Sequence, residues 1–200
     1  MTMPTKMSEG QGRLIILSGP SGVGKTTIAD RLLETTSLER VITATTRAPR
    51  EGEVDGRDYH FMTLQEFRDA IRDGRFLEHA EVYGNLYGTP RADVEDALAA
   101  GRQVLLNIDV QGARQVREVA KELPLASIFL TAPSLEELEN RIRGRNNNSE
   151  EDLQKRLATA KLELPEQRHY HHVVVNDRVE KAVDKILGIL GSQPGKGSAK

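Results

Sequence analysis

Residues 19–26 read Gly-Pro-Ser-Gly-Val-Gly-Lys-Thr, and this octapeptide decides the fold. It matches the pattern G-x-x-x-x-G-K-[ST], which chance produces in about one chain in a hundred or fewer. An apolar run, Arg13–Ser18, precedes it and a helical pattern begins at Thr27, which is the context that a phosphate-binding loop requires. A glycine-rich turn that binds nothing is the alternative, and this context disfavours it.

The spacing of the octapeptide has a chemical reason. Glycine at 19, 22 and 24 lets successive backbone N–H groups point inward as an anion nest, with no Cβ in the way. The helix that follows adds its positive N-terminal end. Lys25 is expected to reach the β- and γ-phosphates, and the Thr26 hydroxyl is expected to ligate Mg²⁺. The residues expected to bind ATP here are Gly19, Pro20, Ser21, Gly22, Val23, Gly24, Lys25, Thr26 and Thr27.

Outward from the loop, short apolar runs alternate with helical patterns. This alternation predicts an α/β fold, a parallel sheet with helices on both faces. The predicted strands are Arg13–Ser18, Gln103–Asp109, Leu125–Thr131 and His172–Val175. The predicted helices are Thr27–Glu34, Arg91–Ala100, Gln111–Glu122, Leu135–Arg143, Glu150–Arg168 and Val179–Leu190.

Two segments interrupt the alternation. Residues 43–89 contain one clear helix, Leu64–Asp73, between strand-like pieces at Tyr59–Phe61 and Phe76–Tyr83, which predicts a small inserted subdomain. Residues 141–156 combine basic residues with an asparagine-rich turn, which is typical of a mobile arm. Residues 1–11 and 191–200 are small and polar, so we expect disordered tails around a domain that covers 12–190.

Composition excludes several classes of protein. The chain has 200 residues and no cysteine, which excludes disulfides and thiolate metal sites and favours a reducing, cytoplasmic location. Lys and Arg number 28 against 30 Asp and Glu, for a net charge of −2, which argues against a nucleic-acid-coating protein. The longest apolar run near the start is too short to span a bilayer, so we expect no membrane partner.

Asp109 closes the predicted strand 103–109. A carboxylate at the carboxyl edge of a parallel sheet lies where such sheets bind ligands, and it would lie next to a loop-bound Mg²⁺. Capping of the next helix is the alternative, and the two roles are compatible. These features predict a nucleoside triphosphatase or a kinase. A GTPase is disfavoured because the nearest candidate for an N-K-x-D motif, Asn176-Asp177-Arg178, does not fit.

The insert supplies the acceptor side. It contains Thr45-Thr46-Arg47-Ala48-Pro49-Arg50, a Gly52–Phe61 run, Phe76-Leu77-Glu78 and Gly84–Thr89. Together with residues 19–26 and Asp109–Gly112, these runs closely resemble the guanylate kinase family over about residues 13–190. The resemblance implies a P-loop core, a GMP-binding subdomain at 43–89 and a lid at 141–156. It also implies transfer of the ATP γ-phosphoryl group to GMP, with dGMP as a further acceptor, and it leaves the oligomeric state open.

Arg47 and Arg50, held by Pro49, form a fork suited to a dianionic phosphate, with a solvated basic turn as the alternative. The resemblance implies that they grip the GMP phosphate with the hydroxyls of Tyr59 and Tyr87. It also implies that Thr43, Thr89 and Asp109 contact GMP.

Glu78 is the base reader that the resemblance implies. One carboxylate accepts both the N1–H and N2–H₂ donors of guanine, whereas adenine would leave it unsatisfied, at a cost of a few kcal/mol. An ordinary strand-face acid is the alternative. Two other functions are possible. One is a kinase for another nucleoside monophosphate. The other is a catalytically silent protein-binding domain, and the intact Lys25 and Thr26 disfavour this second alternative.

The arm at residues 141–156 contains three further candidate site residues. By resemblance, Arg141, Arg145 and Arg156 close over the ATP phosphates and act in catalysis with Lys25 and Arg47, although exposed helix charges are the ordinary explanation for such residues.

Two positions outside the arm complete the resemblance. Asn176 matches a position near the adenine. Asn107 departs from the family, where an acid is usual, and the loss of that charge predicts altered Mg²⁺ handling.

Overall fold

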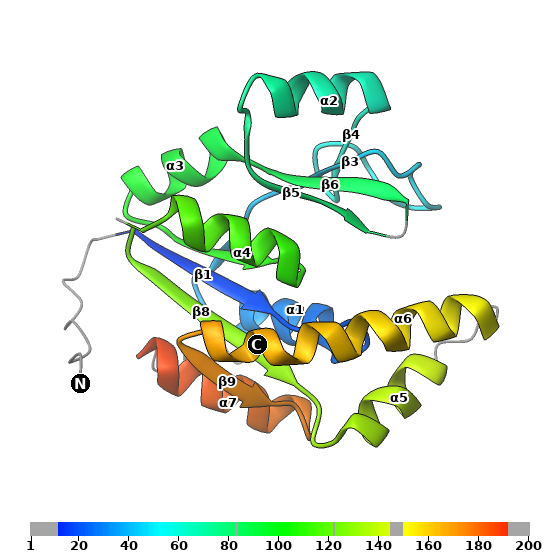
Figure 1. Ribbon diagram of the computed structural model, residues 1–200. Coiled ribbons are helices and arrows are strands. Elements are labelled where there is room, and N and C mark those ends of the chain that lie inside the picture. The colour runs from blue at the N-terminus through cyan, green and yellow to red at the C-terminus, as the bar shows by residue number, and fades with distance from the viewer. Residues whose placement is uncertain (1–11, 83, 122, 145–149, 192–200) are drawn as a thin grey trace.

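A parallel sheet forms the centre of the molecule. The computed structural model describes residues 12–82, 84–121, 123–144 and 150–191. Within these residues, the sheet has five parallel strands in the order β2-β7-β1-β8-β9 (Figure 1). The strands are β1 (Arg13–Ser18), β2 (Glu39–Arg40), β7 (Gln103–Asn107), β8 (Leu125–Thr131) and β9 (His172–Val175).

Helices cover both faces of this sheet because its strands are apolar on both sides. On β1, Ile15 and Leu17 pack into one hydrophobic cluster, whereas Leu14 and Ile16 pack into the other. Burying such a side chain contributes about 1.5–3 kcal/mol. The first face is covered by α1 (Lys25–Thr35), α5 (Leu135–Arg143), α6 (Glu150–Glu163) and α7 (Val179–Leu190), and the second by α3 (Arg91–Ala99) and α4 (Val110–Val119).

A second, mixed sheet lies to one side of the first (Figure 1). Its strands, in the order β4-β3-β6-β5, are β3 (Ala44–Thr45), β4 (His60–Phe61), β5 (Phe76–Val82) and β6 (Asn85–Pro90). Helix α2 (Leu64–Arg72) begins at a capping box in which Thr63 and Glu66 bond each other's backbone N–H groups. Its Phe67 packs on Phe76, with ring centroids 4.5 Å apart, so this sheet has a small core of its own.

Several predicted boundaries are confirmed and others are wrong. The bounds of β1, β8, β9, α5 and α7 match the prediction, and Ser134 caps α5 by accepting a bond from the Glu137 N–H at 3.1 Å. The predicted strand 103–109 ends at Asn107, and the predicted helix 111–122 ends at Val119. The predicted helix 150–168 changes at Glu163 into the 3₁₀ turn Leu164–His169, where Pro165 lacks the N–H that an α-helix needs.

The predicted tails lie almost wholly outside the described residues, except that Gly191 closes α7 with a left-handed φ of 71°. No described helix has the length and apolarity needed to cross a membrane.

Candidate active site

The loop between β1 and α1 adopts the backbone that its glycines allow. Gly19, Gly22 and Gly24 all have positive φ, of 142°, 85° and 96°. At Gly19 a side chain would collide with the carbonyl of Leu130, so glycine is also required there by space. Helix α1 begins at Lys25, immediately after the loop, and its first N–H groups therefore lie at the loop. This is a phosphate-binding arrangement.

Lys25 folds back over the loop. Its Nζ donates hydrogen bonds to the carbonyls of Gly19 at 2.6 Å and Pro20 at 3.0 Å. The ammonium group is thus held at the mouth of the anion nest, where a phosphate oxygen can replace a carbonyl partner.

Asn176 and Arg141 hold the phosphate-binding loop in place through hydrogen bonds. Asn176 is only 4% exposed, and its amide donates to the Val23 carbonyl at 2.9 Å. Arg141 donates from Nη1 to the Asn176 carbonyl at 2.9 Å and pairs through Nε with Glu137 at 2.8 Å. A side chain at Gly24 would lie 2.6 Å from the Asn176 amide. The three segments therefore pack as one support for the loop.

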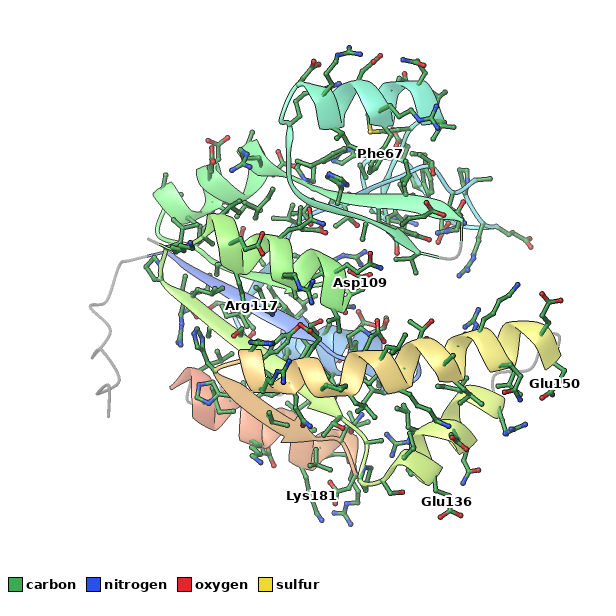
Figure 2. The ribbon with its side chains drawn as sticks, in the orientation of Figure 1. Phe67, Asp109, Arg117, Glu136, Glu150 and Lys181 are labelled. Carbon is green, nitrogen blue, oxygen red and sulfur yellow. The ribbon has the colours of Figure 1, made fainter. Side chains whose placement is uncertain are left out.

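Asp109 lies two residues beyond β7, at the start of α4 (Figure 2). It caps this helix, since its Oδ1 accepts the Gly112 N–H at 2.8 Å. Burial raises the pKa of Asp109, and the Gly112 N–H and the Lys25 charge oppose that rise. The capping role is therefore confirmed, and the carboxylate still faces the Lys25 side of the site.

Glu78 is a buried acid on β5. It is 5% exposed, and its Oε1 accepts the Thr89 hydroxyl at 2.5 Å. Burial raises the pKa of Glu78 to about 7, helped by the negative charge of Asp109 and opposed by the bond from Thr89. A side chain at Gly112 would collide with the Glu78 carboxyl, so helix α4 approaches Glu78 through a glycine. Glu78 is therefore poised to lose its proton when a ligand offers it donors.

Arg47 lies among aromatic rings and one acid. Its Nη2 pairs with Glu53 at 2.8 Å, and its Cζ lies 5.3 Å from the ring centroid of Tyr59. The rings of Tyr59 and Tyr87 meet edge to face, with centroids 6.2 Å apart. The Arg50 backbone N–H donates to Glu53 at 2.7 Å, while its side chain is exposed. Glu53 thus holds the segment that carries both arginines.

One cavity of about 750 Å³ joins these groups, between the core sheet and the second sheet. The sequence-predicted residues that line it are Ser21, Lys25, Thr26, Thr43, Tyr59, Glu78, Tyr87 and Asp109. Thr89 and Arg47 contact lining residues, whereas Thr27, Arg50, Arg141, Arg156 and Asn176 lie outside the lining, and Arg145 is outside the described residues. The phosphate-binding loop and the buried Glu78 carboxyl therefore border one cavity.

Comparisons with known proteins agree on one family. The sequence profile described as "Guanylate kinase" matches residues 11–193. The chain belongs to the guanylate kinase family. A guanylate kinase of Listeria innocua is 50% identical over 185 residues, which cover 92% of this chain and 89% of the relative. One of Paramagnetospirillum magneticum is 44% identical over 193 residues, which cover 96% and 89%.

A solved guanylate kinase shares the fold. The crystal structure from Anaplasma phagocytophilum is 37% identical, with a TM-score of 0.74, and the match covers 94% of this chain and 89% of that one. The α/β fold with a parallel sheet flanked by helices is therefore confirmed as that of a guanylate kinase family member.

The Mg²⁺ expected of a guanylate kinase family member has suitable oxygen donors here. The Thr26 hydroxyl and the Asp109 carboxylate line the same cavity as Lys25. No group of three or more acids, histidines or cysteines in the described residues could hold a metal ion alone. Mg²⁺ characteristically binds through one or two protein oxygens, substrate phosphates and water, so this sparse donor set fits it.

Glu163 is a cavity residue that sequence reasoning missed. It is the last residue of α6 and lines the cavity beside Ser21 and Lys25. Burial raises its pKa, Asp109 adds to that rise, and the Lys25 charge and the Ser21 N–H oppose it. An acid at the end of a polar helix gives no sequence signal of this placement, because the placement depends on how α6 packs on the core sheet. Asn107 also lines the cavity.

Proposed function

We propose that this guanylate kinase family member transfers the γ-phosphoryl group of ATP to GMP, giving ADP and GDP, in the cavity between the loop and Glu78. The observation that carries the proposal is the shared cavity, which places a phosphate cradle and a buried carboxylate on facing sides. A phosphoryl transfer needs both substrates in line with little covalent chemistry, and a single space for two nucleotides supplies that.

The donor side holds the ATP phosphates. The loop N–H groups and Lys25 bind them, and Lys25 exchanges its carbonyl partners at Gly19 and Pro20 for phosphate oxygens. Thr26 and Asp109 would hold Mg²⁺. When bound, the metal neutralises charge on the β- and γ-phosphates. Asn176 contributes by fixing the loop at Val23, and by resemblance it lies near the adenine.

The acceptor side selects guanine. Glu78, as the carboxylate, accepts the paired donors of the guanine edge, with Thr43 and Thr89 hydroxyls beside it. The phosphate of GMP, or of dGMP, is bound by Arg47, Arg50, Tyr59 and Tyr87. The Tyr59–Tyr87 contact and the Glu53 tie support this reading, because both hold phosphate-binding groups at one end of the cavity.

Two segments, residues 43–89 and 141–156, interrupt the alternation of strands and helices in the sequence. Each takes the role that the family resemblance implies. Residues 43–89 serve as the GMP-binding subdomain. Residues 141–156 serve as the lid, with Arg141, Arg145 and Arg156 neutralising phosphate charge on closure. Closure would exclude water and limit ATP hydrolysis. The reaction takes place in the cytoplasm.

A coupled ADP-release assay with GMP, dGMP, AMP and UMP tests the proposal. We expect turnover with GMP and with dGMP, and at least about 100-fold less with AMP, because Glu78 would be left unsatisfied. Faster turnover with AMP than with GMP would overturn the role of Glu78. No turnover with any acceptor would favour a silent protein-binding domain.

A further inference from the structure

Arg40 is a basic residue of the cavity that has no role so far. It is the last residue of β2, the edge strand of the core sheet, and its side chain lines the cavity together with Tyr59 and Tyr87. Its Nη2 donates to the Asp58 carbonyl at 3.2 Å, which carries it across to the loop before β4. Its Cζ lies 5.8 Å from the ring centroid of Tyr59, the same ring that Arg47 approaches at 5.3 Å.

The charge of Arg40 is not neutralised by an ion pair. Arg47 pairs with Glu53 at 2.8 Å, and Arg57 pairs with Asp58 at 2.9 Å. Among the described residues, no carboxylate makes an ion pair with Arg40, and Asp58 senses its charge only as the weakest of several influences on its pKa. Arg40 therefore contributes a full positive charge beside the two tyrosines.

A monophosphate dianion needs about two positive charges in its surroundings, since it carries about −1.5 to −2 at neutral pH. At the acceptor end, the Arg47–Glu53 pair is close to neutral and Arg50 is exposed to solvent. Arg50 alone would leave the dianion half compensated. Arg40 supplies the second charge, from the edge strand of the core sheet.

We propose that Arg40 is a third cationic residue for the acceptor phosphate, reaching it from the core sheet while Arg47 and Arg50 reach it from the second-sheet side. The proposal rests on the proposed function. It gives the bound phosphate partners on both bodies that border the cavity. The acceptor phosphate then acts as a link between the edge strand β2 and the loop before β4.

Two simpler roles compete with this one, and guanosine and salt together separate them. If Arg40 only ties the Asp58 carbonyl, its loss loosens the loop that carries Tyr59, and it weakens GMP binding by the same factor at low and at high salt. If it is merely solvated, its loss weakens neither. A phosphate-binding role weakens GMP alone, because guanosine has the same base and ribose without the phosphate.

The experiment compares Arg40→Gln, Arg40→Lys and the control Arg102→Gln, by NMR titration of each labelled protein with GMP and with guanosine. Arg102 is a suitable control because it is a half-exposed arginine beside the same edge strand, paired with Glu39 and outside the cavity lining. We expect Arg40→Gln to bind GMP about 10-fold more weakly, with guanosine binding changed less than 2-fold. Arg40→Lys should recover most of the affinity, and Arg102→Gln should behave as wild type.

Higher salt should narrow the gap between wild type and Arg40→Gln, because the lost contact is electrostatic. Equal weakening of GMP and guanosine, unchanged GMP binding in Arg40→Gln, or a loss of GMP affinity that high salt leaves unchanged would overturn the role of Arg40 and leave the proposed function intact. Failure of the wild-type protein to bind GMP would overturn both.

Discussion

Lys25 is the residue whose removal should affect chemistry most and folding least. Its Nζ donates hydrogen bonds to the carbonyls of Gly19 and Pro20 in its own loop, and its side chain lines the cavity. Lys25→Ala should lower kcat by about 10²–10³-fold, because a preorganised cation on the transferred phosphoryl group is lost. GMP-dependent ADP release measures this.

Lys181→Ala is a matched control for that variant, since Lys181 is exposed on α7 and pairs with Asp177. It should leave kcat within 2-fold, and both variants should keep the wild-type circular dichroism spectrum. Residual turnover of Lys25→Ala near the wild-type rate would contradict its role in the cradle.

The buried acid Glu78 gives GMP binding a pH dependence. Its pKa is raised to about 7 in the free protein, whereas guanine recognition needs the carboxylate. Below that pKa, binding must also remove a proton, so affinity should fall by up to about 10-fold for each pH unit. The KM for GMP should therefore fall as the pH rises from 6 to 8, while the KM for ATP changes much less. An unchanged KM for GMP across this range would contradict the assignment.

Glu78 should also make the stability of the fold depend on pH, but stability should fall as the pH rises, whereas GMP affinity should increase. Its folded pKa of about 7 lies above the ordinary value of 4.5, so between these values the folded state holds more protons than the unfolded state. The free energy of unfolding therefore decreases as pH rises through this window, by roughly 3 kcal/mol at most for this group. Because glutamine does not titrate, Glu78→Gln should remove this decrease in the free energy of unfolding. Urea unfolding at pH 5 and pH 8 should show the variant gaining relative stability at pH 8, and an equal difference at both values would contradict it.

Asn107 provides a test of the metal site. It lines the cavity two residues before Asp109, and it is neutral where the resemblance to the guanylate kinase family implies an acid. Asn107→Asp should strengthen Mg²⁺-dependent ATP binding, because a second carboxylate attracts the cation. Titration of ATP binding against Mg²⁺, by fluorescence of a labelled ATP, measures the shift, and an unchanged Mg²⁺ midpoint would remove the hypothesis.

At the scale of elements, helix α4 connects the two sheets. Gln115 on α4 bonds both backbone groups of His79 on β5, accepting its N–H at 3.1 Å and donating to its carbonyl at 2.6 Å. Strand β5 is an edge of the second sheet, so Gln115 takes the place of a neighbouring strand at that point. It thereby fixes the backbone next to Glu78.

Gln115→Ala should lower the free energy of unfolding by about 1–3 kcal/mol, because two partly buried backbone groups lose their partner. The KM for GMP should rise as well, since the backbone beside Glu78 is no longer held. Gln65→Ala is the control, because the exposed Gln65 bonds only Asp69 on its own helix. Urea denaturation and steady-state kinetics give both readouts, and a variant that matches Gln65→Ala in both would contradict this role for Gln115.

Elements with a strong apolar pattern could be predicted from sequence, and elements defined by tertiary pairing could not. Strand β1 contains an unbroken apolar run, and helix α5 begins at a serine cap. The predicted bounds of both elements are confirmed. Strands β2 and β3 are two residues long, so their sequence has no periodicity to detect, and they form only because neighbouring strands pair with them. The missed β6 is interrupted by Gly88, which packs against Phe67 and Phe76.

The same distinction holds for the site. The loop at 19–26 has a local motif with a fixed backbone, so its chemistry was predictable from spacing. Arg40 and Glu163 reach the cavity from a short edge strand and a helix end, and neither carries a motif. Their placement depends on how β2 pairs with β7 and on how α6 packs on the core sheet, which are properties of the folded molecule.

At the scale of the whole molecule, the cavity lies between two bodies with separate cores. The clusters around β1 do not include the Phe67–Phe76 core of the second sheet. A ligand that binds Glu78 on β5 and the loop side of the core sheet adds contacts to both bodies at once. Binding should therefore stabilise the fold as a unit, rather than one sheet alone.

Thermal unfolding with and without nucleotide tests this coupling and its base specificity together. At 100 times its Kd, GMP should add about 2.7 kcal/mol to the free energy of unfolding, which corresponds to a rise in Tm of about 5–11 °C for a chain of this size. The same concentration of AMP should raise Tm by less than about 2 °C, because it leaves the Glu78 carboxyl unsatisfied. A single transition that moves as a whole is expected if both bodies share the ligand. Two transitions, of which GMP shifts only one, would show that the sheets unfold separately, and an equal shift with AMP would contradict guanine selection by Glu78.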